Sequence, residues 1–409
     1  MKVWLKYILG IALGVAFAII LPPQSEQARA ALDFVTDLVI RFGRYALVPM
    51  LFFSIATACF KLRDEKLMLK TGLWTFALII LSSLFLVALG LGAALLFCKQ
   101  QIPMGIEQTN DIPTLDVPAL LVKLFPYSGF SSLLNDSYLL PCFVFAGFIG
   151  AGAADDQAAS RNAMALFTSL GKVCYNVMSF FTEILSVGMI AIVCRWTLVF
   201  IALHRLGTYA ELFRLLAILL AIVGVVVYPL ILRILCHEHH PFRVLYASIA
   251  PFCIAFFSAD SNLVLPLATR HGKESLGIRH RVNAVTYPLF SIFARGGAAL
   301  VVCVCFIAIL RSYSLLKIER ETIMWIGTSA FLLSFLLGEH PTEGPFLALT
   351  IMCMNYGNGF EAGFLLLRDA APILCSFAAA FDVLTAMTGS YIVGLKTHTV
   401  KRQEIAKFI

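Results

Sequence analysis

The chain has 409 residues, of which 60% are hydrophobic and 13% are charged, and its formal net charge is +7. Soluble domains carry about 25% charged residues, so the composition excludes a soluble protein and predicts an all-α polytopic membrane protein. The modest positive charge gives no reason to expect a nucleic-acid partner.

Neither catalysis nor metal binding is expected from the residue pattern. The 11 Cys residues are scattered and form no CxxC pair, so a zinc site or a disulfide framework is not expected. The sequence shows no nucleophile–base set and no phosphate-binding loop. An enzyme is therefore the least expected class, and we expect no catalytic residues, no metal and no cofactor beyond a sodium ion or a proton used for coupling.

Six membrane-crossing helices are predicted in the first part of the chain. Such a helix needs about 20 mostly apolar residues. The runs of that kind lie near 4–21, 38–60, 72–98, 138–154, 173–203 and 211–235. We expect the first run to be an uncleaved helix, although Ala28-Arg29-Ala30 resembles a signal-peptidase site. Arg41 and Arg44, at one end of the second run, are expected to snorkel to the membrane surface.

The charges of the loops set the expected orientation. Loop 61–66 is basic and is expected in the cytoplasm. The polar loop near 99–136 has more Asp and Glu than Lys, so it is expected outside. The basic linker 270–281 and the basic tail 396–407 are expected inside.

The second half of the chain repeats one pattern twice. In each copy an apolar segment, broken midway by polar residues, precedes a long apolar helix. The first copy comprises 243–268, broken at Ser258–Asn262, and a helix near 282–310. The second comprises 322–353, broken at Gly338–Gly344, and a helix near 363–394. With an odd number of crossings between them the copies would be inverted, which is the architecture of secondary transporters.

The two polar breaks are candidate binding sites. Each half-segment is too short to cross a bilayer, so we expect hairpins with tips at membrane depth; the alternative is a pair of polar loops at the membrane surface. Half-helix N-termini suit an anionic group of a substrate, and unwound carbonyls suit a cation. The candidate substrate-binding residues at the tips are Asp260, Ser261 and Asn262 in the first, and His340, Pro341 and Thr342 in the second.

Further polar residues are candidates for ion or proton coupling. Glu339, His340 and Glu343 lie at the second tip, and histidine can move a proton near physiological pH. His340 could equally be a solvated loop residue. Ser82 and Ser83, in the third apolar run, could bind an ion or bond back to their own helix.

The stretch Tyr287–Leu300 contains the residue that most needs an explanation. It places a Pro, Arg295 and a Gly-Gly pair inside an apolar run, and an Arg at mid-membrane costs about 2.5–3.5 kcal/mol on insertion scales. Arg295 is either half of a structural ion pair with Asp382 or Asp260, or a group that binds an anionic substrate or stands where a coupling cation would sit. Asp382 is expected to be functional, because an unpaired buried carboxylate is costly.

Five stretches in chain order give the sequence its resemblance to a known family. Leu47–Ser54 is similar to the family stretch LVxPLVFxS, Ser258–Pro266 to its serine-rich first hairpin, Pro288–Leu300 to the segment around NMDGT, Gly338–Gly344 to the GxPGxG tip, and Thr388–Val393 to the end of the last helix. Over nearly its whole length the chain resembles the dicarboxylate/amino acid:cation symporters, the glutamate-transporter homologues.

The resemblance implies a glutamate-transporter-like fold with eight transmembrane helices, two re-entrant helical hairpins and inverted repeats. The scaffold would comprise spans 1 and 2 in 1–71 and spans 4 and 5 in 137–210. Span 3 and the outer loop would lie in 72–136. Span 6 and the transport core would lie in 211–409. The core would comprise a hairpin at 243–270, span 7 at 282–310, a hairpin at 322–355 and span 8 at 363–395. The family also implies an elevator motion, a homotrimer and a multi-pass location in the bacterial inner membrane.

The residues that bind sodium and substrate in the family are mostly replaced here. In the segment similar to NMDGT, the positions of the Asn, Met, Asp and Thr hold Ala294, Arg295, Gly296 and Ala298. In the last helix, the family has a substrate-binding Asp and Arg where this chain has Cys375 and Ala378. The family's sodium-binding Asp is replaced by Ala386, and a nearby Asn of the family is replaced by Asp382. Sodium-coupled glutamate transport is therefore not expected to carry over unchanged.

We expect a symporter of a small carboxylate-bearing solute, such as a dicarboxylate or an amino acid, with atypical or absent sodium coupling. Arg295 would act as a tethered cation in place of sodium, paired with Asp382 or with the carboxylate of the solute. Coupling would then use protons or be absent. The replaced site residues also leave open a non-transporting membrane sensor or pseudo-transporter, and a passive channel.

Overall fold

The structure is a computed structural model that describes residues 2–20, 26–97, 117–135, 137–313, 318–357, 359–404 and 408. The described residues form helices and their connections, with no strand among them beyond an isolated bridge between Ile278 and Val400. The all-helical class predicted from the composition is confirmed.

Helices follow one another along the described residues. The first half contains α1 (Val3–Ile20), α2 (Glu26–Arg44), α3 (Leu47–Asp64), α4 (Met68–Phe97), α5 (Val117–Leu124), the short η1 (Gly129–Leu133), α6 (Leu140–Ala153) and α7 (Gln157–Leu206). The second half contains α8 (Ala210–Ala221), η2 (Ile222–Val227), α9 (Tyr228–Cys236), α10 (Phe242–Ser258), α11 (Ser261–Glu274), α12 (His280–Phe293), α13 (Gly296–Tyr313), α14 (Arg320–Ser334), η3 (Leu337–Glu339), α15 (Gly344–Tyr356), η4 (Gly363–Leu367) and α16 (Ala371–Lys396).

Seven helical segments of the described chain are long and apolar enough to cross a membrane, which makes this a polytopic membrane protein. They are Val3–Ile20, Gln27–Asp64, Met68–Phe97, Gln157–His204, Ala210–Cys236, His280–Tyr313 and Ala371–Lys396. Each overlaps a predicted span. The predicted span near 138–154 corresponds to α6, whose 14 residues extend about 21 Å, less than the thickness of the hydrocarbon core. Length and apolarity thus support seven of the eight predicted crossings.

The predicted outer loop near 99–136 is not a simple polar loop. Residues 98–116 and 136 lie outside the described residues. The described part contains α5 and η1, because Val117–Leu124 is an apolar run that can form two helical turns.

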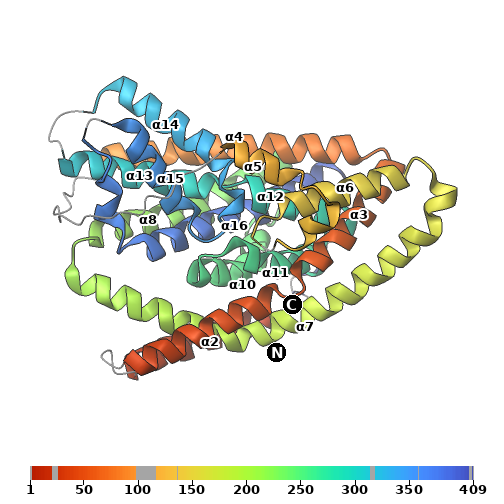
Figure 1. Cartoon of the computed structure of the whole chain (residues 1–409), viewed down its shortest axis with the longest axis horizontal. Helices are drawn as coiled ribbons and strands as arrows, with labels where there is room; N and C mark the ends of the chain where they lie inside the picture. The colour runs from red at the N-terminus through yellow and green to blue at the C-terminus, as the bar shows by residue number, and fades with distance from the viewer. Residues whose placement is uncertain are drawn as a thin grey trace.

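The helices form two packing groups that meet along α12 and α11. In the first group α1, α2 and α3 pack against α7, and α3 also packs against α6. In the second group α13 packs between α4 and α16, and α10 packs along α16. Figure 1 shows α4 along one long side of the molecule and α7 along the other, with α12 and α16 between them. The groups meet where α12 contacts α3 and where α11 contacts α2 and α7.

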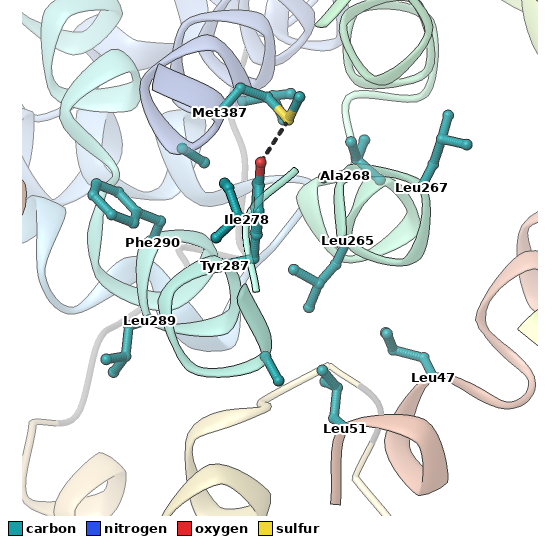
Figure 2. Packing of buried hydrophobic residues seen from close by; sticks show 14 of the residues in the cluster. Leu47, Leu51, Leu265, Leu267, Ala268, Ile278, Tyr287, Leu289, Phe290 and Met387 are labelled. Carbon is teal, nitrogen blue, oxygen red and sulfur yellow. Dashed lines mark hydrogen bonds between the residues drawn. The ribbon is translucent and has the colours of Figure 1, made fainter. Parts of the chain in front are cut away.

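Tyr287 joins several helices at this meeting line. Its side chain is fully buried, and its hydroxyl donates a hydrogen bond to Sδ of Met387 on α16 over 3.3 Å (Figure 2). The same buried cluster contains Leu265 of α11 and Leu47 and Leu51 of α3. A buried aromatic side chain contributes a large apolar area, and a tyrosine hydroxyl needs a partner when it is buried. Tyr287 therefore helps to fix α12 against both packing groups.

Candidate solute-binding site

Arg295 lies in a break between α12 and α13. Helix α12 ends at Phe293 and α13 begins at Gly296, within one apolar segment. A Cβ atom on Gly296 would lie 2.7 Å from Cα of Ser83 on α4. One on Gly297 would lie 2.3 Å from Cβ of Phe381 on α16. Because only glycine permits such close approach, the Gly-Gly pair lets two helices pack directly against the break.

Arg295 and Asp382 form a buried pair across this break. Arg295 is 4% exposed and Asp382 is 5% exposed. Nη1 of Arg295 lies 3.9 Å from Oδ2 of Asp382, whereas charge-assisted hydrogen bonds are about 2.7–2.9 Å long. The other carboxylate oxygen, Oδ1, accepts a hydrogen bond from the backbone N–H of Gly297 over 2.7 Å. Of the two partners expected for Arg295, the structure places Asp382 within ion-pair distance.

Asp260 closes the turn between α10 and α11. Helix α10 ends at Ser258, and Ala259 follows in the left-handed conformation with a φ of 54°. Oδ1 of Asp260 then accepts hydrogen bonds from the backbone N–H groups of Asn262 and Leu263, over 2.9 and 3.2 Å. This is the N-cap arrangement that aspartate favours. The polar break predicted near Ser258–Asn262 is therefore a tight connection between two helices.

The guanidinium of Arg44 donates a hydrogen bond to the second carboxylate oxygen of Asp260. The sequence predicts that Arg44 snorkels to the membrane surface, and that prediction is wrong. The side chain of Arg44 is 12% exposed and that of Asp260 is 0% exposed. The reason is that the end of α2 packs near α11, where a fully buried carboxylate needs a counter-charge. Arg41, one turn earlier, is exposed and pairs with Asp37.

The other two first-tip candidates are buried beside Asp260. Ser261 is 4% exposed, and its Oγ has no hydrogen-bond partner among the described residues. Nδ2 of Asn262 donates to the backbone oxygen of Ser137 over 2.9 Å. Ser261 thus has unused hydrogen-bonding capacity, whereas Asn262 anchors the tip to the segment before α6.

The two serines of α4 differ from one another. Oγ of Ser82 donates to the backbone oxygen of Ile79 on its own helix over 3.1 Å, as the back-bonding alternative predicts. Ser83 is fully buried, and its Oγ has no partner within the described chain. Ser83 lies next to Gly296, so it belongs to the surroundings of the break.

The second tip, between α14 and α15, carries its charges nearer the surface. Glu339 forms an ion pair with Lys123 of α5 over 2.5 Å. His340 is half-buried, and its Nδ1 has no partner in the part of the chain that the structure describes. Pro341 is buried, Thr342 is half-buried and Glu343 is exposed.

The structure places Asp382 within ion-pair distance of Arg295 and beside the first-tip residue Ser261, and the second-tip candidates are not among the residues that line the cavity there. A cavity of about 10 Å³ lies beside Asp382 and Ser261, with its lining drawn from α11, α12 and α16. That volume is close to the smallest that holds one water molecule. A larger, mostly apolar cavity of about 220 Å³ lies between α4, α9, α12 and α16, and Ser82 is among its lining residues.

Sequence reasoning missed two partners at this site. Arg44 was hidden because a charged residue at the end of an apolar run is usually an interfacial anchor. The backbone N–H of Gly297 could not be identified because the sequence does not show which main-chain group bonds to a side chain. The Gly-Gly pair indicated only that another helix approaches closely. Among the described residues no three His, Cys, Asp or Glu side chains gather closely enough to hold a metal ion.

Comparisons with known proteins show which family this sequence is similar to. A family model described as the sodium:dicarboxylate symporter family matches residues 3–395. Neutral amino acid transporter B(0) of Oryctolagus cuniculus is 25% identical over 370 residues, which covers 78% of this chain and 66%, just under two thirds, of that protein. Serine/threonine transporter SstT of Enterococcus faecalis is 24% identical over 309 residues, which covers 74% of this chain and 70% of that protein.

The match to the family model extends over almost the whole chain, and the relatives are transporters rather than enzymes. The long apolar helices place such a protein in a membrane. This chain therefore belongs to the sodium:dicarboxylate symporter family.

Proposed function

We propose that this protein is a secondary active transporter of a small carboxylate-bearing solute, such as a dicarboxylate or an amino acid. The observation that carries the proposal is the buried Arg295–Asp382 pair at the break between α12 and α13. Buried charges in a membrane segment are costly and are usually retained for a pathway or a site. A guanidinium also has the planar donor geometry that suits a carboxylate.

Coupling to sodium would be atypical or absent. The buried carboxylates of Asp260 and Asp382 each have an arginine as counter-charge. A sodium ion added to either carboxylate would compete with a guanidinium already in place. Arg295 would thus act as a tethered cation in the place of a coupling ion. Proton coupling, if present, would run through Glu339, His340 or Glu343 at the second tip.

The transport cycle would follow the architecture that the family resemblance implies. Eight crossings and two re-entrant hairpins, α10–α11 and α14–α15, would form a transport core in 211–409 together with span 3, and spans 1, 2, 4 and 5 would form the scaffold. The core would move against the scaffold as an elevator within a homotrimer, in the bacterial inner membrane. The two packing groups seen in the fold are compatible with such a division.

Uptake into proteoliposomes with imposed sodium and proton gradients tests the proposal. We expect accumulation of a radiolabelled carboxylate or amino acid without a requirement for sodium. Uptake that depends strongly on sodium and is indifferent to pH would refute the tethered-cation hypothesis. Arg295→Ala should abolish uptake while the protein is still inserted in the membrane, with Arg41→Ala, at an exposed pair, as the matched control.

A second candidate is a non-transporting sensor or pseudo-transporter. It is favoured by the small size of the cavity beside Asp382, about 10 Å³. It is also favoured by the Arg295–Asp382 pair, whose opposite charges balance without a bound ligand. A protein of this kind would bind its solute but show no uptake driven by the gradient of that solute. Uptake and binding measured on the same preparation separate the two candidates.

A further inference from the structure

The segment that follows α16 folds back over the helices instead of leaving them. An isolated antiparallel bridge joins it to the connection between α11 and α12. The N–H of Arg279, in that connection, donates to the backbone oxygen of Thr399 over 3.1 Å. The N–H of Lys401 donates in turn to the backbone oxygen of Gly277 over 2.9 Å. The segment is therefore bound through its main chain, as an added strand is bound at the edge of a sheet.

Two glycines make room for this segment. Gly277 has a φ of 72°, and a Cβ atom there would lie 1.8 Å from the backbone oxygen of Lys401. A Cβ atom on Gly394, near the end of α16, would lie 2.9 Å from Cγ2 of Val400. A side chain at either position would push the segment away, so the surface beneath it is shaped for the close approach of a backbone.

A buried carboxylate provides the first side-chain anchor of the segment. Nη2 of Arg402 donates to Oε2 of Glu238, in the connection between α9 and α10, over 3.0 Å. The side chain of Glu238 is 2% exposed, whereas that of Arg402 is 57% exposed. The hydroxyl of Tyr391 on α16 donates to the same oxygen over 3.3 Å. Because a buried carboxylate needs a counter-charge, this acidic group favours the bound position of Arg402.

An aromatic side chain is the second anchor. Phe408 is 3% exposed, and the centre of its ring lies 5.9 Å from that of Tyr246 on α10. The guanidinium of Arg243, also on α10, lies 5.1 Å from the centre of the Phe408 ring, within the range of a cation–π interaction. The ring of Trp4 on α1 meets Tyr246 edge to face at 5.9 Å. Phe408 is thus anchored where α10 packs against α1 of the first packing group.

These contacts join parts of both packing groups and are easy to undo. They link α16 with the two connections at the base of the α10–α11 pair, and through Tyr246 they reach α1. The described part of the segment forms no helix, and a short two-stranded contact is marginally stable by itself. More than half of the Arg402 side chain is already exposed. Release of the segment therefore requires no helix to unfold.

We propose that Thr397–Arg402 and Phe408 form a releasable clasp, here named the tail clasp, which holds the base of the α10–α11 pair against α1 and α16. While the tail clasp is bound, the base of the pair is held to α1. Its release lets the base move, so the bound clasp slows transport. The slowing of transport rests on the proposed function, whereas the clasp rests on its own contacts.

Hydrogen exchange on the full-length protein in proteoliposomes tests the tail clasp. The amides of Arg279 and Lys401 are bonded across it, so they exchange when it opens. We expect Phe408→Ala and Arg402→Gln each to speed this exchange by about fivefold or more, because each variant removes one anchor. Mass spectrometry with fragmentation to single residues measures each amide separately.

Two controls accompany the exchange measurement. The amide of Ile278 donates to the backbone oxygen of Gly272 in α11, not to the tail clasp, so its exchange should stay unchanged in both variants. Phe97→Ala removes an exposed phenylalanine at the end of α4 and should change neither the exchange at Arg279 nor uptake.

Uptake and a peptide added in trans distinguish a clasp from a structural brace. In the double variant R402Q/F408A, initial uptake of radiolabelled L-alanine or succinate should rise about fivefold even though the melting temperature falls. A synthetic peptide of residues 397–409, present on both sides of the membrane, should return uptake to the wild-type rate and protect the amide of Arg279 again. The same peptide carrying both substitutions should do neither. A brace would instead lower uptake and melting temperature together.

Each outcome decides one of the two proposals. If exchange at Arg279 rises in the variants and the peptide reverses it, but no protein takes up a carboxylate or an amino acid, the tail clasp stands and the transport proposal fails. If uptake occurs and exchange at Arg279 is the same in the wild type and the variants, the tail clasp is overturned and transport stands. Uptake that falls with the melting temperature and is not restored by the peptide also overturns the tail clasp.

Discussion

The helix pairs α10–α11 and α14–α15 have the same place in the repeated pattern and are held in very different ways. The tip of the first pair carries the fully buried Asp260, which caps α11 and binds Arg44 of the other packing group. The tip of the second pair carries Glu339, whose side chain is 17% exposed and whose partner Lys123 is 52% exposed. A buried pair cannot be broken without stranding a charge, whereas a surface pair is easily replaced by water. The comparison teaches that the charged residue of the first tip is held more firmly than that of the second.

Breaking the first tip should have the largest effect. Arg44→Ala leaves the carboxylate of Asp260 buried without a counter-charge, which should destabilise the protein by about 3–5 kcal/mol. The melting temperature in detergent measures the loss. Arg41→Ala, three residues earlier on α2 at an exposed pair, is the control and should cost about 1 kcal/mol or less. Equal shifts for the two variants would contradict the assignment of Arg44 to the tip.

Hydrogen exchange compares the two tips directly. The amides of Asn262 and Leu263 are bonded to the buried Asp260, so they exchange only when the first tip opens. We expect them to exchange at least about tenfold more slowly than the amides of Thr342 and Glu343 at the second tip. Mass spectrometry on the reconstituted protein measures both peptides at once. Faster exchange at the first tip would reverse the comparison.

The backbone strain of the first tip offers a smaller test. Ala259 has a φ of 54°, a conformation that costs about 1–2 kcal/mol for residues other than glycine. Ala259→Gly removes that strain and adds about 0.5–1 kcal/mol of chain entropy to be lost on folding. The net result should be a stabilisation of up to about 1 kcal/mol, seen as a higher melting temperature. Destabilisation by this variant would show that the side chain of Ala259 packs in a way that outweighs the strain.

Removing the surface pair of the second tip should have the smallest effect. Lys123→Ala should change stability by about 1 kcal/mol, because half of the Lys123 side chain is exposed and water screens the pair. Exchange at Thr342 and Glu343 should become slightly faster while exchange at Asn262 stays unchanged. A loss of stability as large as that of Arg44→Ala would mean that both tips are fixed alike.

The helices were predictable because their cause is local. Long apolar runs give helices in any membrane protein, so the positions of the spans, the broken segments near Ser258–Asn262 and Gly338–Gly344, and the Gly-Gly pair could be read directly. Helix α6 was predicted at the right place, and its crossing stays a prediction because its 14 residues are fewer than the about 20 that a span needs.

The site could be predicted only in part. Arg295 and Asp382 were singled out because single charges in apolar runs are rare, and their pairing was one of two alternatives. The roles of the tip residues stay predictions, and the structure separates the second-tip candidates from the cavity beside Asp382. Arg44 could not be found from its own sequence context, because its partner is 216 residues away.

The sequence by itself determined that this is a helical membrane protein with two interrupted segments and a few costly charges in the second half, and its family resemblance implied a symporter. These features depend on composition and on short-range patterns. Tertiary structure alone decided which charges meet, because pairing depends on where α2, α11, the break before α13 and α16 come together. In a low-dielectric interior that choice of partners decides which buried charges are compensated.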